Sequence, residues 1–209
     1  MDFINMSIAN DNILKIFLNL SNIKTNDGLE LSIDENKIEE LNHEDYKGKR
    51  IFAIISDKYG NSEEIKVDIG VHVSTDICQD ELILNTNILD NNITFLANPV
   101  EQIIVEKLMP IVKFGELSGR YKDVFDIYWL VTNKDISKDL LMLCLNRNIF
   151  RGINVSDLSS LIETLKEVFN SKIYSNGVEK SNNWLDIDTQ TIFKSIIDYF
   201  ENIEEKIEV

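Results

Sequence analysis

The 209-residue sequence predicts an α+β fold in which a strand-rich amino-terminal part precedes a helical carboxyl-terminal part. Two observations support this prediction. Between Gly28 and Gly70 the apolar residues alternate or form short β-branched runs, which is typical of strands. After Pro99 they recur at helical spacing, which is typical of amphipathic helices. We therefore expect a strand-rich core over residues 1–97 and a helical half over residues 98–209.

The strand-rich part also contains one early helix. In "NDNILKIFLNL", residues 10–20, the apolar residues have helical spacing, and Asn10 or Asp11 is available to cap the start. The segments "LELSI", "KRIFAIIS" and "EEIKVDIG" follow as predicted strands, and "DKYGNSEE" joins the last two as a hairpin turn. The stretch "TDICQDELILNTNILDNNITFLANP" adds two short strands, after which Pro99 opens a helix.

The second half reads as a series of amphipathic helices separated by short polar segments. The first predicted helix ends near Gly115. The helical segments are "PVEQIIVEKLMPIVKFG", "RYKDVFDIYWLVT", "SKDLLMLCLNR", "VSDLSSLIETLKEVF" and "DTQTIFKSIIDYFENIEEKI".

Composition narrows the class of protein. The sequence is 44% hydrophobic, and no run approaches the roughly 20 apolar residues that a membrane helix needs, so we expect no membrane association and a cytoplasmic location. A net charge of −15 opposes non-specific attraction to nucleic acid. The two cysteines, Cys78 and Cys144, and the two histidines, His43 and His72, are too scattered to indicate a disulfide framework or a zinc site.

One acidic residue stands on a predicted strand. In "IKVDIG", residues 65–70, three alternating apolar residues share one face, so Lys66 and Asp68 point to the other face. Asp68 is either an exposed residue of an edge strand or an acid that a rigid element holds for chemistry. Taken alone, the first alternative is favoured.

Charged residues also gather within residues 105–130. Lys107 lies on one predicted helix, whereas Arg120, Lys122, Asp123 and Asp126 cluster at the start of the next. Helical spacing places the two aspartates on one side and allows Lys122 to pair with Asp126. These residues either stabilise the helix start through its dipole and solvated ion pairs or form part of a site. Spacing alone favours the first alternative.

The stretch "NPVEQIIVEKLMPIVKFGELSGRYKDVFDIYWL", residues 98–130, resembles the AbiEii/AbiGii family of abortive-infection nucleotidyltransferase toxins. The late motifs of that family read Glu-Lys-Leu on one helix and Arg-x-Lys-Asp-x-x-Asp on the next. "IKVDIGVH" is similar to the acidic strand of the family, and "DGLEL", "YKGKRI" and "NNW" occur in the same order, so the resemblance covers essentially the whole chain. It implies a polymerase-β-like mixed sheet followed by a helical bundle.

The start of the chain, "MDFINMSIAND", resembles the end of a strand that reads Arg-x-Ser/Thr-x-Asp-x-Asp-Phe in this family. Asp2 then corresponds to the second aspartate of that motif. The first aspartate and a preceding Gly-Gly element are expected to be missing, through a late start, a cut chain or a gene remnant. The resemblance therefore implies weak or no transferase activity for residues 1–209.

The resemblance also implies roles for individual residues. Asp2 and Asp68 would hold Mg²⁺, and Asp68 would act as a catalytic residue. Lys107 would contact the phosphates of the donor, and Asp123 would orient a lysine or the acceptor hydroxyl. The substrate-binding residues would be Arg120, Lys122 and Asp126, although Asp126 also suits a structural role.

The function that follows is transfer of a nucleotide from an NTP to an acceptor such as tRNA, by a toxin that acts with a cognate antitoxin in phage defence. The alternative is a non-catalytic remnant that binds the antitoxin. A third hypothesis is a metal-dependent nuclease that uses Asp68, Asp123 and Asp126, which would need a further Glu or His at the metal.

Overall fold

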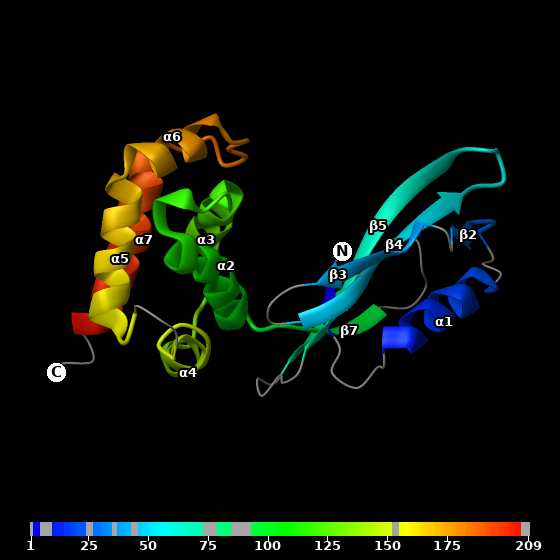
Figure 1. Ribbon diagram of the computed structural model, residues 1–209, viewed down its shortest axis with the longest axis horizontal. Coiled ribbons are helices and arrows are strands. Elements are labelled where there is room, and N and C mark those ends of the chain that lie inside the picture. Colours follow the sequence, from blue (N-terminus) through cyan, green and yellow to red (C-terminus); the bar gives the residue numbers. More distant parts are fainter. Residues whose placement is uncertain are drawn as a thin grey trace. The chain divides into compact units, whose positions relative to one another are not determined.

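The chain divides into two compact units, a strand unit over Met1–Asp76 and a helical unit over Ile77–Val209, and each is described by itself. The computed structural model describes residues 2–4, 10–23, 27–34, 37–42, 46–72, 79–84, 93–151 and 155–205 (Figure 1). A strand-rich part with one early helix precedes a helical part, so the predicted α+β class is confirmed. The predicted boundary after residue 97, where strands give way to helices, stays a prediction; the division into compact units falls between residues 76 and 77.

A mixed sheet forms most of the strand unit. Strand β5 pairs with β1 in parallel and with β4 in antiparallel orientation, and β4 also pairs with β2 and β3. The mixed sheet implied by the family resemblance is thus present. The strands are β1 (Asp2–Ile4), β2 (Glu30–Ile33), β3 (Glu39–Asn42), β4 (Tyr46–Ser56) and β5 (Ser62–His72).

The turn between β4 and β5 has the predicted hairpin chemistry. The Asp57 carboxylate accepts hydrogen bonds from the backbone N–H groups of Tyr59 and Asn61, at 2.8 and 2.9 Å. Gly60 has a φ of 87°, a conformation that side chains other than glycine rarely adopt. The turn therefore fixes the register of the long β4–β5 pair.

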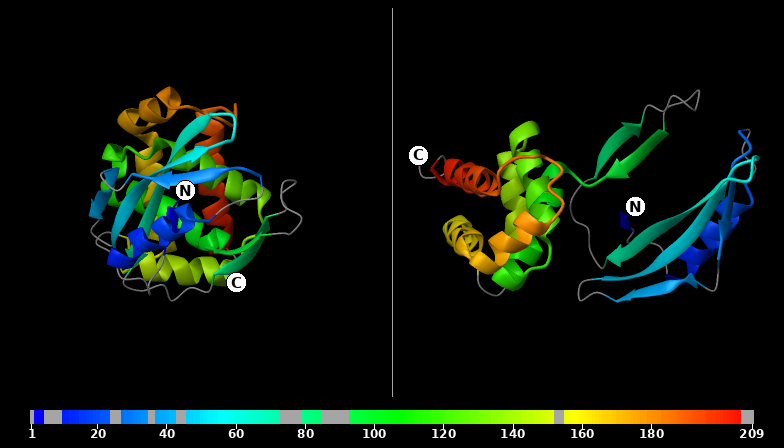
Figure 2. Two further views of the ribbon diagram at one scale, coloured as in Figure 1. Left: turned by 90° about the vertical axis from the view of Figure 1, so that its right-hand side faces the viewer. Right: turned by 90° about the horizontal axis from the view of Figure 1, so that it is seen from above.

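Helix α1 (Asn10–Ser21) packs against β2 and β4, and Figure 2 shows it along one face of the sheet. Phe17 of this helix contacts a core formed by Ile51, Val67 and Ile69, which are at most 7% exposed. Because side chains alternate along a strand, burial of Val67 and Ile69 directs Asp68 to the opposite face. The predicted alternation of β5 is confirmed.

The helical unit begins with a two-stranded antiparallel sheet and continues with helices packed around one core. All five predicted helices of the second half are present. The structure adds α6, which the sequence analysis missed because "KIYSNGVEK" contains a glycine and an asparagine. The elements are β6 (Asp80–Leu84), β7 (Ile93–Ala97), α2 (Val100–Phe114), η2 (Gly115–Leu117), α3 (Tyr121–Asn133), α4 (Lys138–Asn148), α5 (Leu158–Asn170), α6 (Lys172–Lys180) and α7 (Thr189–Glu205).

The missed helix α6 holds the beginning of α3 in place. The ring of Tyr121, the first residue of α3, lies with its centroid 5.5 Å from that of Tyr174 on α6. It also lies over Gly177, where an added Cβ would be 2.3 Å from Cζ of Tyr121. Gly177 therefore provides the space into which the Tyr121 ring packs.

We predict that Gly177→Ala destabilises the protein. Alanine is favoured over glycine in a helix by about 1 kcal/mol, but an overpacked contact costs roughly 1–3 kcal/mol. Because the Tyr121 ring has to move, we expect the free energy of unfolding in urea to fall by about 1 kcal/mol. In a Tyr121→Ala background the same change should stabilise the protein. A gain in the unmodified background would contradict this explanation.

Candidate functional site

The acidic strand residue predicted from the sequence lies inside the sheet rather than at its edge. Strand β5 is flanked by β1 and β4, so the edge-strand interpretation of Asp68 is wrong. The register pairs Asp68 with Asp2 on β1 and with Arg50 on β4. The side chain of Asp68 is 29% exposed, so it is accessible to solvent although its strand is held on both sides.

Arg50 binds Asp68 through a bidentate ion pair. The Nε of Arg50 donates a hydrogen bond to Oδ1 of Asp68 at 2.7 Å, and Nη2 donates to Oδ2 at 2.8 Å. The Nη1 of Arg50 donates to Glu39 on β3 at 3.2 Å. The hydrogen bond from Arg50 lowers the pKa of Asp68, so this carboxylate is charged at neutral pH. Sequence analysis missed Arg50, since its partner is 18 residues away.

The placement of Asp2 and Asp68 on adjacent strands is confirmed at the level of the backbone. The side chain of Asp2 lies outside the described part of the structure. Opposed aspartates on neighbouring strands offer oxygen ligands, which suit Mg²⁺. Among the described residues, no three or more acidic, His or Cys side chains gather as a metal site. Two carboxylates would leave ligand positions for water and a bound phosphate, which Mg²⁺ usually keeps in proteins.

A second group of charged residues lies in the helical unit, where α2 packs against α3. The Nζ of Lys107 donates hydrogen bonds to Asp123 at 3.2 Å and to Asp126 at 2.6 Å. The Nε of Arg120 lies 3.9 Å from Oδ2 of Asp123. The structure therefore brings together four of the residues that the sequence analysis selected.

The predicted pairing of Lys122 with Asp126 is wrong. Within the described ranges, Lys122 forms no ion pair, because Lys107 reaches across from α2 and occupies the carboxylate of Asp126. Burial lowers the pKa of Lys107, but the hydrogen bond to Asp126 and the charge of Asp123 outweigh it and leave the pKa above its ordinary value of 10.5. Lys107 is thus a fixed cation at neutral pH.

A hollow of about 240 Å³ opens beside this group at the beginning of α3. Arg120 is 69% exposed, and its side chain does not cap the helix. Helix dipoles make such a beginning favourable for anions. The residues that line the hollow are Gly119, Arg120, Tyr121, Lys122, Asp123 and Ser181.

Tyr174 packs against the ring of Tyr121 at the beginning of α3, and it was also not predicted from the sequence. It is fully buried, and its hydroxyl has no hydrogen-bond partner among the described residues. Burial raises the pKa of Tyr174, and the negative charge of Asp123 raises it further. The sequence signal was weak because Tyr174 lies on the unpredicted helix α6.

Of the remaining polar residues that the sequence analysis considered, the described residue Cys144 joins neither group. Cys144 is a free cysteine in the helical core, and burial raises the pKa of its thiol. Cys78 and His43 lie outside the described residues. The nuclease hypothesis required a further Glu or His beside its acids, and the described residues contain no such metal cluster.

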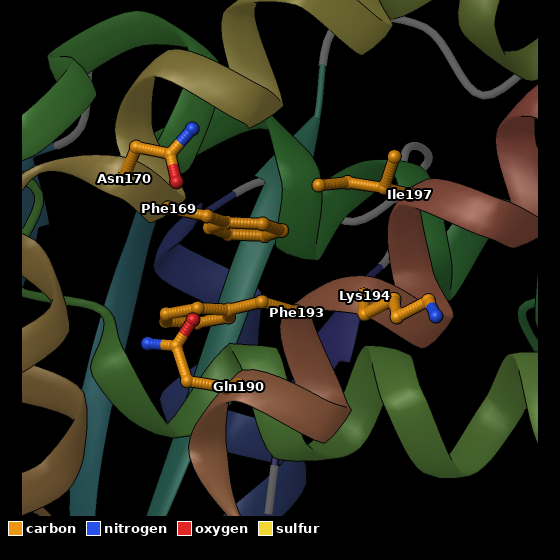
Figure 3. Close-up of a pocket in the computed structure, with 6 residues that line it drawn as sticks. All are labelled: Phe169, Asn170, Gln190, Phe193, Lys194 and Ile197. Atoms are coloured by element: carbon orange, nitrogen blue, oxygen red, sulfur yellow. The ribbon is translucent and has the colours of Figure 1, made fainter.

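Another hollow lies between α5 and α7 and contains none of the predicted site residues (Figure 3). Phe169 and Phe193 stack within it, with ring centroids 4.3 Å apart. Asn170, Gln190 and Lys194 line its polar part. The stacked rings belong to the core of the helical unit.

An acid on an inner strand of a mixed sheet, followed by helices that carry a lysine and two aspartates, is consistent with a nucleotidyltransferase. A family model described as "Nucleotidyl transferase AbiEii toxin, Type IV TA system" matches residues 3–183. The chain belongs to this AbiEii family of nucleotidyltransferase toxins from type IV toxin–antitoxin systems. A comparison with curated proteins found no match.

Family membership confirms the resemblance on which the sequence analysis relied, and it implies an antitoxin as partner. The roles of individual residues, the donor and the acceptor stay predictions. In the parts of the chain that the structure describes, no helix combines the length and apolar character required to cross a bilayer.

We predict that Lys107→Met destabilises the protein, because it removes the cation that lies between Asp123 and Asp126 and leaves Asp126 without an ion-pair partner. Removing one partner from a partly buried polar contact costs roughly 1–3 kcal/mol, which we expect to find by urea unfolding at pH 7. Since the folded-state pKa of Lys107 is raised, its contribution is fully present below pH 10.5 and is lost as the pH rises through the folded pKa.

The matched control is Lys107→Met combined with Asp123→Asn and Asp126→Asn, which removes the charges of both partners. This variant should recover part of the lost stability, because the two neighbouring carboxylate charges are no longer present to repel each other. If the triple variant is less stable than Lys107→Met alone, the ion pairs do not explain the effect.

Proposed function

We propose that the protein transfers a nucleotidyl group from an NTP to an RNA acceptor such as tRNA, and that this modification arrests growth. In the reaction, an acceptor hydroxyl attacks the α-phosphorus, and pyrophosphate leaves. The observation that carries the proposal is family membership over residues 3–183, together with the two charged groups that lie at the motif positions.

We infer that Asp68 and Asp2 hold the divalent cation. Bound Mg²⁺ would neutralise charge on the triphosphate and on the leaving pyrophosphate. Support comes from the position of Asp68 on an inner strand, where pairing on both sides fixes its backbone. A fixed carboxylate loses little freedom on binding, which favours accurate positioning.

Lys107, Arg120 and Lys122 are proposed to bind the phosphates of the donor. Lys107 is suited to this role because its raised pKa keeps it protonated, so it acts as a cation rather than as a base. Asp123 and Asp126 position it through hydrogen bonds. Three cations face two carboxylates in this group, and the excess positive charge favours an anionic ligand.

The acceptor needs a local basic surface, because the chain as a whole carries a net charge of −15. Arg120 and Lys122 are both exposed at the hollow and supply such charge. The salt dependence of such binding scales with the number of phosphates contacted, so binding of a tRNA through few cations should depend only modestly on ionic strength. The proposed acceptor class is tRNA, and its contacts are limited to the surface around Arg120 and Lys122.

The test is incorporation of α-³²P-labelled nucleotide into a tRNA pool with each of the four NTPs. Asp68→Asn should reduce incorporation by about 100-fold or more, because it removes a charge that holds the cation. The matched control is Glu64→Gln, which makes the same charge change at an exposed position of the same strand and should retain activity.

Label that is absent with every NTP, or equal label in the wild type and in Asp68→Asn, would contradict the proposal. The same variants should be expressed in a bacterial host, where growth arrest should follow the incorporation of label. Arrest that persists in Asp68→Asn would separate toxicity from transfer.

One observation favours the alternative of a non-catalytic protein that binds the antitoxin. Both oxygens of Asp68 are engaged by Arg50, so the proposed metal ligand is already neutralised. In that case the chain should co-purify with its cognate antitoxin without NTP or Mg²⁺, and it should give no labelled tRNA.

A further inference from the structure

The bidentate pairing of Arg50 with Asp68 lies at a solvent-accessible position on an inner strand of the sheet. The β4–β5 ladder extends over ten residue pairs besides this one, so the two strands are held together without the side-chain contact. The core beneath it is formed by Val67 and Ile69, on the other face of the sheet. The contact is therefore better explained by the site that contains Asp68.

Arg50 lies in a row of opposed charged residues across four strands. The register pairs Asp2 with Asp68, Asp68 with Arg50, and Arg50 with Glu39. Aspartates at opposed positions on neighbouring strands repel each other when both are charged, and a nearby cation relieves that repulsion. Arg50 is in direct contact with the central aspartate and has three hydrogen bonds to carboxylates in this row.

We propose that Arg50 is the resident counter-cation of Asp68 and leaves this carboxylate when a divalent cation and a nucleoside triphosphate bind together. This inference rests on the proposed function. A divalent cation alone meets a carboxylate whose two oxygens are both engaged by Arg50. A triphosphate brings anionic oxygens that match the guanidinium fork, so it offers Arg50 a new partner as Asp68 turns to the metal.

A different role for Arg50, orientation of Asp68 for the metal, predicts the opposite effect on metal affinity. If Arg50 only orients Asp68 for the metal, its removal should weaken metal binding, because the carboxylate becomes less ordered. If Arg50 competes with the metal, its removal should strengthen metal binding in the absence of nucleotide. Affinity for the cation alone therefore distinguishes the two roles without a measurement of turnover.

We expect Arg50→Met to bind Mn²⁺ about tenfold more tightly than the wild type when no nucleotide is present, since a neighbouring positive charge is removed. The measurement is the electron paramagnetic resonance signal of free Mn²⁺ during titration. The same variant should bind a fluorescent ATP analogue in Mn²⁺ less tightly than the wild type, because the triphosphate loses its partner.

Two further variants separate charge from contact. Lys37→Met makes the same charge change in the strand unit but breaks a pair with Glu64, so it should leave Mn²⁺ affinity unchanged. Arg50→Lys keeps the charge and loses the fork, so it should raise Mn²⁺ affinity less than Arg50→Met. Circular dichroism of each variant should show that the sheet is retained.

Unchanged or weaker Mn²⁺ binding by Arg50→Met overturns the inference. If Asp68→Asn nevertheless abolishes labelling of tRNA, the proposed function stands without it. If Asp68→Asn changes neither Mn²⁺ binding nor labelling, the site assignment fails, and the inference fails with it.

Discussion

The long antiparallel pairing of β4 with β5 is the constraint on which the strand unit depends. Its register determines which residues of β5 face the core and which face outward. With Val67 and Ile69 held against Phe17, Asp68 has to emerge on the opposite face, beside Arg50. A slip by one residue would bury the acid and expose the core. The same ladder that stabilises the sheet therefore positions the carboxylate.

In the helical unit, packing between helices rather than strand register positions the charged residues. Lys107, Asp123 and Asp126 come from two helices, and packing between α2 and α3 brings them within hydrogen-bond distance. The aromatic contact between Tyr121 and Tyr174 anchors the helix that carries both aspartates. In both units each candidate acid that the structure describes is already paired with a cation, so ligand binding would exchange partners rather than create charges in isolation.

Local pattern was sufficient to predict most elements but few of the contacts. The hairpin turn, the alternation of β5 and five helices of the second half follow from residue type and spacing, which act over short distances. Helix α6 was not predicted because Gly177 lowers helix propensity. The same glycine leaves the space into which the ring of Tyr121 packs. Spacing alone also favoured a structural role for the acids near Arg120, and only the family motif selected them as site residues.

The sequence by itself determined the α+β class, the family and the identity of the candidate residues, because periodicity and motif order are properties of the chain. The tertiary structure decided which charges meet. Arg50 is 18 residues from Asp68, and Lys107 is 19 residues from Asp126. Lys122, which lies close to Asp126 in sequence, was the wrong partner, since strand register and helix packing rather than sequence distance bring charges together.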